Sequence, residues 1–447
     1  MAFLPEFGGV LMTLVAFVVA LSIIVAIHEY GHYIVGRWSG IHAEVFSLGF
    51  GPVLFSRHDR RGTKWQIALF PLGGYVRFMG DSDAASGKDG DAVRTMSAEE
   101  RRRTMHGAPL WARAATVAAG PVFNFILSIV IFATLMISRG DVAEPLTVGE
   151  IQPLPGSGFE LRAGDEIVAI EGANVPAFGD GPAFRDFSED LPQRPDLEYT
   201  VLRDGSEMQV SGPYLYPPLV SQLAPQSAAY DIGLKQGDVI TGVDGTPIFD
   251  FAQLKDQVES SDGRVLLLTV FRPGADSPLE FALAPRRVDE PMPEGGFRTE
   301  WRIGIAGGLA FEPARESRGV LDGIWGGVEQ TGRIMGSSIS GLWHMITGAI
   351  STCNMTGPIG IAQTSGAMAS QGADSFIWFV AALSTAVGLL NLFPIPVLDG
   401  GHLVFHAFEA VTGRPPSDRA LRILMTLGLA LILTVMAFAL TNDIFCP

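Results

Sequence analysis

The sequence has little of what soluble proteins contain in quantity. Charged residues make up 17% of its 447 residues, whereas about a quarter is usual. Basic residues are outnumbered by acidic ones, 31 to 47, so the chain lacks the positive balance that nucleic acid attracts, and we expect no nucleic-acid partner. Only two cysteines occur, Cys353 and Cys446, which excludes a disulfide framework. One bridge could form between them, but we expect two unpaired or buried thiols.

Four long apolar stretches stand out in this weakly charged chain. They lie at about 8–36, 114–138, 376–393 and 420–440, and each reaches or approaches the roughly 20 residues that cross a bilayer. The first has neither the positive start nor the cleavage site of a signal peptide, so we interpret it as a retained helix. The sequence therefore predicts a multi-pass α-helical membrane protein with four transmembrane helices.

The charges are distributed unevenly around these stretches. No Lys or Arg precedes the first one, whereas residues 37–113 hold 12 of the 31 basic residues. By the positive-inside rule this loop is cytoplasmic, which places both termini and residues 139–374 on the exterior side of a lipid bilayer. The exterior segment holds 16 basic and 33 acidic residues, a net charge of −17, so it should avoid anionic surfaces.

The exterior segment contains an internal repeat. "LRAGDEIVAIEG" at 161–172 aligns with "LKQGDVITGVDG" at 234–245 at a constant offset of 73 residues. Each copy has a Gly-Asp turn, an alternating apolar strand and an acidic-Gly turn, which predicts two exterior β-rich domains. Further on, residues 319–348 have apolar positions near helical spacing among charges. That pattern favours a helix on the outer membrane surface, with an ordinary domain helix as the alternative.

The first apolar stretch ends in "HEYGH", residues 28–32, a His-Glu-x-x-His arrangement. Residues four apart share a helix face, so His28 and His32 can bind one ion, and Glu29 can reach a water on that ion. Ionisable groups in a transmembrane helix cost about 2.5–3.5 kcal/mol each, which favours a functional site over a structural histidine pair. The pattern predicts two zinc ligands and a general base near the cytoplasmic side, because Arg37 follows closely.

A catalytic zinc needs a third protein ligand, and "NLFPIPVLDGGHLVFH" at 391–406 offers candidates. Two prolines break the third apolar stretch here, and irregular backbone at membrane depth is tolerated only where it is buried in protein or lines a cavity. We predict Asp399 as the ligand, because its negative charge offsets the dication in a low-dielectric setting. His402 and His406, also four apart, are the rivals; otherwise His402 lies behind the ligands or on a helix face.

Three separated motifs carry a family resemblance: "HEYGH", "GPVFN" at 120–124 and "NLFPIPVLDGG" at 391–401. Together they resemble the site-2 protease family. The second exterior repeat resembles a bacterial PDZ domain, and the tandem of PDZ-like domains resembles the RseP-type bacterial group of that family. The resemblance implies a zinc metalloendopeptidase that cuts within the membrane and holds one Zn²⁺.

The resemblance also implies roles for individual residues. The zinc ligands would be His28, His32 and Asp399, and the catalytic base would be Glu29. Asn391 falls where the family has a polar residue that engages the substrate backbone. For Asn124, an interhelical hydrogen bond is the favoured interpretation over a direct part in catalysis.

"KWQIALFPLGGYVRFMG" at 64–80 has apolar β-formers on both sides of Gly73-Gly74. This pattern predicts a β-hairpin within the cytoplasmic loop. In the family such a hairpin enters the membrane and pairs with substrate, which implies substrate-binding roles for Gly73, Gly74 and Tyr75. The alternative is a short cytoplasmic sheet.

Substrates and location follow from the same resemblance. It implies single-span membrane proteins as substrates, with anti-sigma factors of an envelope-stress pathway and remnant signal peptides as the expected classes. A C-terminal peptide is the expected ligand of the second PDZ-like domain, because the first copy is three residues shorter before its Gly-Asp turn. Alternatively, both copies only pack and shield.

The expected location is the bacterial inner membrane, with both termini and the PDZ-like domains on the periplasmic side. Two other function classes fit parts of the sequence. A zinc transporter would need a continuous polar path across the bilayer, yet the outer halves of the spans are apolar. A PDZ membrane scaffold would leave "HEYGH" without a role.

These predictions divide the chain into consecutive segments. In order, they are the first helix with the metal motif (1–37), the cytoplasmic loop with its hairpin (38–112), the second helix (113–138), the first PDZ-like domain (139–212), the second (213–310), exterior interfacial helices (311–374), the third membrane region (375–410), a cytoplasmic loop (411–419) and the fourth helix with the exterior C-terminus (420–447).

Overall fold

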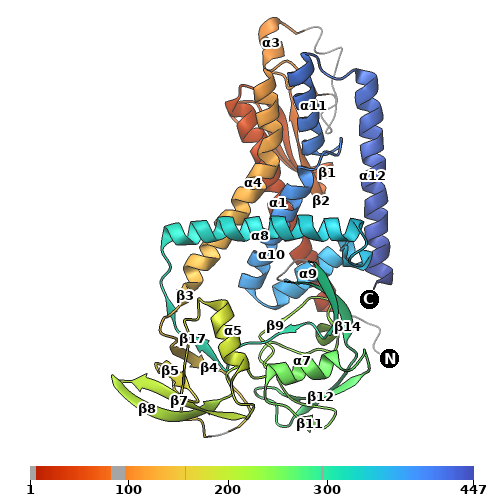
Figure 1. Ribbon diagram of the computed structural model, residues 1–447. Helices are drawn as coiled ribbons and strands as arrows, with labels where there is room; N and C mark the ends of the chain where they lie inside the picture. The colour runs from red at the N-terminus through yellow and green to blue at the C-terminus, as the bar shows by residue number, and fades with distance from the viewer. Residues whose placement is uncertain (1–6, 82–95, 157, 293–295, 447) are drawn as a thin grey trace. The chain divides into compact units, whose positions relative to one another are not determined.

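The structure is a computed structural model that describes residues 7–81, 96–156, 158–292 and 296–446 (Figure 1). Residues 1–6, predicted to be exterior, and residues 82–95 of the predicted cytoplasmic loop lie outside the described residues. The chain divides into two compact units. The first, called the membrane unit here, comprises 1–135, 320–348 and 352–447, and the second, called the repeat unit, comprises 136–319 and 349–351.

Four helices in the described residues are long and apolar enough to cross a membrane. They are α1 (Phe7–Trp38), α4 (Leu110–Arg139), α10 (Ala373–Asn391) and α12 (Asp418–Phe445). Large apolar side chains such as Leu11 and Leu427 are about 60% exposed on them, as expected where lipid rather than water is the neighbour. The prediction is therefore confirmed to the extent that the four stretches form helices long and apolar enough to cross a membrane.

The third membrane region is broken where its prolines predict a break. Helix α10 ends at Asn391, and α11 (Asp399–Thr412) begins after seven intervening residues. A Cβ atom on Gly400 or Gly401 would collide with the backbone carbonyls of this connection, so both positions allow α11 to start tightly against it. Asp399 is consequently the first residue of a new helix rather than part of a loop.

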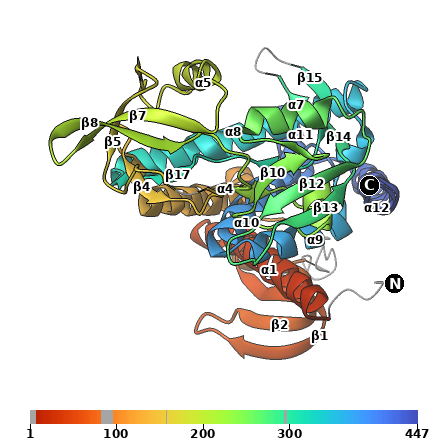
Figure 2. The same ribbon diagram turned by 90° about the horizontal axis from the view of Figure 1, so that it is seen from below.

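Strands β1 (Ala43–His58) and β2 (Lys64–Phe78) form an antiparallel sheet in the membrane unit beside α1 (Figure 2). Val45 of β1 pairs with both Lys64 and Arg77, so β2 bends around β1 and lies on both sides of it. Gln66 of β2 likewise pairs with both Ser47 and Ser56, so β1 bends as well and the two strands form four paired segments. The predicted hairpin exists, but its predicted turn is wrong. The chain reverses at 59–63, whereas Gly73 and Gly74 lie inside β2. The apolar residues before Gly73 pair back onto β1 instead of forming the first arm of a hairpin.

The far end of α12 is fastened to the segment before α9 (Pro358–Ser370). Cys353 forms a disulfide with Cys446, which corrects our expectation of two unpaired thiols. The bridge closes 93 residues of sequence, a separation at which the sequence alone gives no sign of proximity. Beside it, the Asp443 carboxylate accepts hydrogen bonds from the backbone N–H groups of Gly357, Ile359 and Gly360 at the start of α9.

Helix α8 (Val320–Ile346) runs crosswise to α12 within the membrane unit (Figure 1). Its exposed residues include Leu321, Trp325, Trp343 and Ile346, each more than 60% exposed. The remaining short elements of this unit are α3 (Ala98–Arg102) and the 3₁₀ turn η1 (Thr352–Asn354).

The repeat unit contains two four-stranded sheets with matching strand order, β6-β5-β7-β8 and β11-β10-β12-β13. Their strands are β5 (Glu166–Ile170), β6 (Ala173–Asn174), β7 (Asp196–Arg203), β8 (Ser206–Pro213), β10 (Val239–Val243), β11 (Thr246–Pro247), β12 (Leu266–Phe271) and β13 (Leu279–Leu283). A nine-residue helix accompanies each sheet, α5 (Gly181–Glu189) in the first and α7 (Phe251–Glu259) in the second. The repeat in the sequence is thus a repeat of structure.

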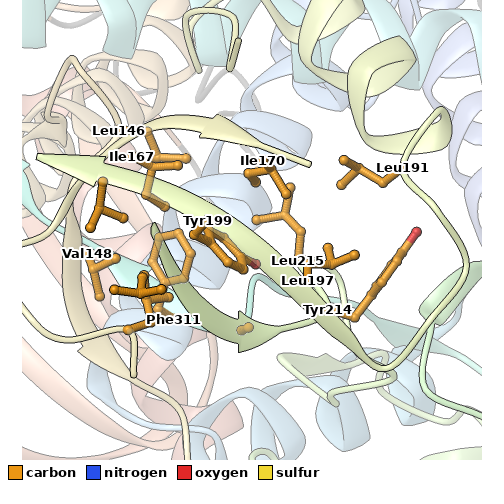
Figure 3. Close-up of a cluster of buried hydrophobic side chains, with 14 of the residues drawn as sticks. Leu146, Val148, Ile167, Ile170, Leu191, Leu197, Tyr199, Tyr214, Leu215 and Phe311 are labelled. Atoms are coloured by element: carbon orange, nitrogen blue, oxygen red, sulfur yellow. The ribbon is translucent and has the colours of Figure 1, made fainter. Parts of the chain in front are cut away.

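The first repeat encloses a core that includes Ile170, Leu197, Tyr199 and Phe311 (Figure 3). Phe311 belongs to β17 (Phe311–Pro313), which pairs with β4 (Val148–Ile151), and β18 (Arg315–Glu316) pairs with β3 (Asp141–Val142). Residues 311–316 therefore return to the first repeat as strands. Our prediction that helices begin at 311 is wrong for these residues. They form strands that pair with β4 and β3, and the Phe311 side chain completes the core of the first repeat.

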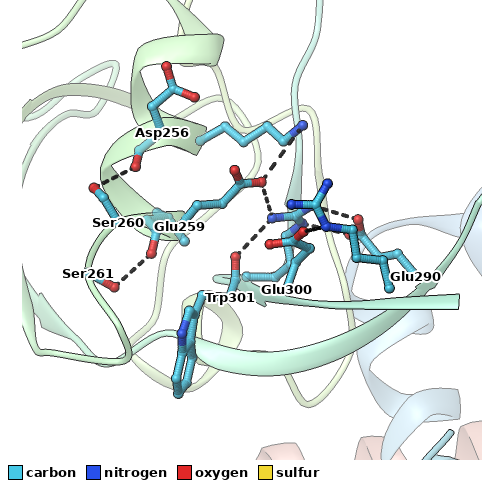
Figure 4. A network of polar contacts seen from close by, with 11 residues as sticks. Asp256, Glu259, Ser260, Ser261, Glu290, Glu300 and Trp301 are labelled. Atoms are coloured by element: carbon cyan, nitrogen blue, oxygen red, sulfur yellow. Dashed lines mark hydrogen bonds and ion pairs between the residues drawn. The ribbon is translucent and has the colours of Figure 1, made fainter. Parts of the chain in front are cut away.

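The second repeat has its own core and a polar network on its surface. Arg302 donates two hydrogen bonds to Glu290 and one to Glu259, which joins α7 to the strands β14 (Arg286–Pro291) and β15 (Phe297–Arg302) (Figure 4). The remaining elements of the unit are β9 (Gln222–Leu223), α6 (Ala228–Asp231) and β16 (Ile305–Ala306). Helix α6 occupies the stretch that is three residues shorter in the first repeat.

Candidate metal centre

His28 and His32 lie one turn apart on α1, and their Nε2 atoms are 3.2 Å from each other. This proximity follows from helix geometry, since residues four apart project from nearly the same face. Both side chains are only about 12% exposed. The two imidazoles therefore aim at one point inside the bundle.

Asp399 on α11 faces the same point. Its carboxylate oxygens lie 3.2 Å from His28 Nε2 and 3.6 Å from His32 Nε2. The candidate ligand atoms of the three residues all lie within 4.8 Å of one another, and no other group of three such side chains in the described ranges is this close. His402, the rival third ligand, is not part of the group.

The hydrogen bonds around this cluster leave lone pairs directed at its centre. His32 Nδ1 lies 2.8 Å from the backbone carbonyl of Thr116, which can only accept, so Nδ1 donates, and in the neutral imidazole Nε2 then carries a lone pair. The Asp399 Oδ2 atom is buried and receives no hydrogen bond within the described part of the chain. The Asp399 carboxylate and the Nε2 atoms of His28 and His32 meet at this point, where a cation would bind all three. Two imidazole nitrogens and a carboxylate suit Zn²⁺.

Asn124 on α4 touches the other ligand. Its Nδ2 atom lies 3.3 Å from His28 Nδ1, and the side chain is completely buried. Rotation of the amide would bring Oδ1, which has no hydrogen-bond partner among the described residues, to the same place, where it could accept the Nδ1 proton and free Nε2. The backbone carbonyl of Asn124 accepts hydrogen bonds from Ser128 and Ser384, so α4 and α10 hold this residue in place. The contact joins α4 to α1 at a candidate metal ligand.

Gly120, one turn before Asn124, makes room for the imidazoles. A Cβ atom there would collide with His32 Nε2 and lie 2.8 Å from His28 Cε1. Gly31 similarly allows α1 to approach α4, because a Cβ there would lie 2.5 Å from the carbonyl oxygen of Ala119. Any residue larger than glycine at these positions would push the two helices apart.

Glu29 lies on the side of α1 that faces β2. A Cβ added to Gly74 would be 3.1 Å from Glu29 Cγ, and the backbone of Val76 makes a hydrogen bond to the Glu29 carboxyl group. The carboxyl group thus lies beside an extended backbone and next to the ligand cluster. Gly74 is accordingly the member of the predicted substrate-binding set that reaches the site.

The other predicted residues have separate contacts. The Asn391 amide donates to the Val387 carbonyl one turn earlier in α10. The Tyr75 ring stacks on Phe50, and its hydroxyl accepts a hydrogen bond from Gln66. A Cβ on Gly73 would collide with Phe50. The His402 ring packs edge-on against Phe405.

Two contributors to the site were missed in the sequence. The Thr116 carbonyl has no sequence signal, because every residue carries one. Gly120 stands in the motif that we quoted, but its function as a space for imidazoles depends on which helices cross there. A tertiary contact of this kind is invisible until α1 and α4 are placed together.

The comparisons with known proteins agree with this geometry. The model of a family described as "Peptidase family M50" matches residues 16–435. The chain belongs to peptidase family M50. Our prediction of a site-2-type metallopeptidase is therefore confirmed at the level of family and enzyme class.

Individual M50 relatives match this peptidase along almost its whole length. A protein of Rhizobium meliloti with the provisional name zinc metalloprotease is 36% identical over 433 residues, which cover 97% of this chain and 96% of the relative. One of Agrobacterium fabrum with the same provisional name is 34% identical, covering 96% and 95%. The regulator of sigma-E protease RseP of Salmonella typhimurium is 32% identical, covering 97% and 99%.

Proposed function

We propose that this M50 peptidase is an intramembrane zinc endopeptidase that cuts single-span membrane proteins. The observation that carries the proposal is the convergence of His28, His32 and Asp399 between a membrane helix and a helix that begins at a break in another membrane region. The relatives' names, which include zinc metalloproteases and a sigma-E regulator, agree with it. One zinc ion, held by these three residues, would leave one position open for water or substrate.

When bound, zinc supplies Lewis acidity and lowers the pKa of a coordinated water toward about 7. The chain supplies the remaining functions. Glu29 takes a proton from the attacking water at its carboxylate and later delivers it to the leaving amine. Asn124 and the Thr116 carbonyl orient the two imidazoles through their Nδ1 atoms. Asp399 brings the negative charge that a dication needs in a low-dielectric interior.

The sheet of β1 and β2 is the proposed docking place for the unwound substrate. Phe50, Leu54, Phe55 and Phe70 are 42–65% exposed on it, which suits contact with lipid and with apolar substrate side chains. A transmembrane helix that unwinds needs new partners for its backbone, and strand addition provides them. The close approach of Gly74 to Glu29 would place a strand paired near Gly73, Gly74 and Tyr75 beside the catalytic base.

Asn391 and His402 have secondary roles in this proposal. Asn391 would donate to the substrate backbone or to the developing oxyanion, for which its amide must leave the Val387 carbonyl. His402 lies one turn after Asp399 on α11 and would support the ligands from behind. Both roles rest on the family resemblance more than on contacts.

The sidedness of the molecule is also part of the proposal. The basic loop at 37–113 favours the cytoplasm for the ends of α1 and α4 that flank the metal centre. The Cys353–Cys446 disulfide at the opposite end of α12 fits the oxidising bacterial periplasm. The repeat unit would then be periplasmic, and the exposed tryptophans of α8 would lie at the outer membrane surface.

The proposed substrate class rests on the family resemblance and on the name of the Salmonella relative, a regulator of sigma-E protease. Anti-sigma factors with one span are the proposed principal substrates, and remnant signal peptides a second class. We interpret the two repeats as PDZ-like domains that filter substrates by the size of their exterior part. The second would in addition bind the C-terminus left by an earlier cut.

The proposal is tested with Glu29→Gln in proteoliposomes that contain a labelled single-span substrate. This variant should retain zinc but cleave about 10²–10⁴ times more slowly, as removal of a general acid–base predicts. Glu99→Gln, which changes an exposed glutamate of α3, is the matched control and should cleave normally. Undiminished cleavage by Glu29→Gln would exclude the protease mechanism. Zinc flux without any cleavage in the unmutated protein would favour a transporter, and absence of bound zinc would favour a scaffold.

A further inference from the structure

Within the membrane unit, an ion pair joins α4 to α11. Arg113 Nη1 lies 3.0 Å from Glu409 Oε2, and Nη2 lies 2.6 Å from Oε1. The side chains are only 15% and 18% exposed. The guanidinium also donates from Nε to the carbonyl of Ala108, so all three of its nitrogens are engaged. Such a parallel, charge-assisted pair fixes orientation as well as distance.

Both partners sit on elements that carry groups of the metal centre. Arg113 precedes Thr116 by three residues, and the Thr116 carbonyl holds the His32 imidazole. Glu409 follows Asp399 by ten residues on α11, about 15 Å along the helix axis and about 80° around it. The ion pair therefore connects the helix that orients one ligand with the helix that supplies another.

Helix α11 needs such a connection more than the other site helices do. It has 14 residues and follows seven residues of non-helical chain, whereas α1 and α4 have 32 and 30. Its N-terminal end is fitted closely against that chain at Gly400 and Gly401. Leu403 packs the first half of α11 against the buried cluster around Tyr33, and the Arg113–Glu409 pair holds the opposite end of the helix, three residues before it stops.

We infer that Arg113 and Glu409 are positioning residues for the metal centre. The pair sets the tilt and rotation of α11 against α4, so that the Asp399 carboxylate meets the two imidazoles. This inference rests on the proposed zinc site, but neither residue touches the ligands, the substrate or the reacting atoms. Loss of the pair should speed the release of the metal, while the chain stays folded.

The test measures metal retention by the full-length protein in detergent micelles. Glu409→Gln keeps the shape of the side chain but removes its charge, and it should release zinc to a chelator about 10-fold faster than the unmutated protein. With Co²⁺ in place of zinc, its visible absorption spectrum, which reports ligand geometry, should change. Arg113→Lys keeps the charge but loses the two parallel hydrogen bonds of the guanidinium, so its rate of zinc release should lie between those of the unmutated protein and Glu409→Gln. The double variant Arg113→Glu with Glu409→Arg should restore slow release.

A matched control separates positioning from general stability. Asp238→Asn breaks an equally close Arg–carboxylate pair, with Arg272, in the repeat unit. That variant should lose stability but keep the release rate and the Co²⁺ spectrum. The inference is overturned if Glu409→Gln and Arg113→Lys both release zinc at the unmutated rate with an unchanged spectrum, or if the swap restores nothing. An unmutated protein that binds no zinc would instead overturn the proposed function.

Discussion

The two units of this peptidase bury aspartates in opposite ways. In the repeat unit, Asp238 is 1% exposed and receives two 2.7 Å hydrogen bonds from Arg272 and one of 2.8 Å from the Lys235 N–H. Asp165 in the first repeat has the corresponding set from Arg203 and the Arg162 N–H. In the membrane unit, Asp399 faces two imidazole nitrogens, and one of its oxygens receives no hydrogen bond within the described residues.

This difference separates a structural carboxylate from one that is arranged to bind. Donors surround Asp165 and Asp238 on all sides, so each fixes a turn and a strand of its repeat and has nothing left to offer a ligand. At Asp399 the neighbours are imidazole nitrogens, which can bind a positive ion together with the carboxylate. Burial alone does not identify a functional carboxylate, whereas the character of its neighbours does.

The largest effect should come from Asp399→Asn. Structural zinc sites with four protein ligands bind with about 10–16 kcal/mol, so weakening one of the three ligands here should lower zinc affinity by about 10²–10³-fold. Zinc content after dialysis against a graded chelator series measures this change. Asp238→Asn serves as the control and should keep its zinc. Equal zinc content in the Asp399 variant and the unmutated protein would show that Asp399 is not a zinc ligand and does not differ from Asp238 in this respect.

Asp238→Asn should have the next largest effect, and on stability alone. It leaves the Arg272 guanidinium, which is 22% exposed, without its charge partner, and the repeat unit should lose about 3 kcal/mol of unfolding free energy. Proteolysis of the full-length protein in increasing urea, followed at sites in the second repeat, reports this loss. Conversely, equal resistance to proteolysis would show that the buried pair contributes nothing beyond its desolvation cost.

The smallest effect concerns acid. Burial raises the pKa of Asp165, but the Arg203 guanidinium and the Arg162 N–H together hold it below its usual value of 3.8. Because the folded-state pKa is depressed, the stabilising contribution is present above about pH 4 and declines as pH falls below it. The difference in proteolytic resistance between the unmutated protein and Asp165→Asn should therefore shrink on acidification. A difference that grows instead would reverse the sign that we assign to the pair.

Features with a local cause could be predicted from the sequence. The four spans follow from apolar length, and the shared face of His28 and His32 follows from helical spacing. The constant offset of 73 residues predicted a doubled domain, because the same turns at the same spacing fold in the same way. Two prolines marked the place where α11 begins.

Features decided by tertiary contacts could not be predicted. Gly73-Gly74 looks like a hairpin turn, yet pairing of β2 with both halves of β1 moves the reversal to 59–63. The bridge between Cys353 and Cys446 depends on how α12 returns to η1, and the Arg113–Glu409 pair spans 296 residues. In each case the partner is far along the chain, and many equally plausible partners compete for it.

The small size of Gly120 suggests a variant that is useful for identifying substrates. Replacing its hydrogen with a methyl group would obstruct the imidazoles without adding or removing any charge or proton-transfer group. Under the proposed function, an alanine there should impair zinc binding and cleavage while the β1–β2 sheet, on which the substrate is proposed to dock, keeps its own residues. Such a version could capture intact substrates in cell membranes and so reveal, by crosslinking, what this peptidase cuts.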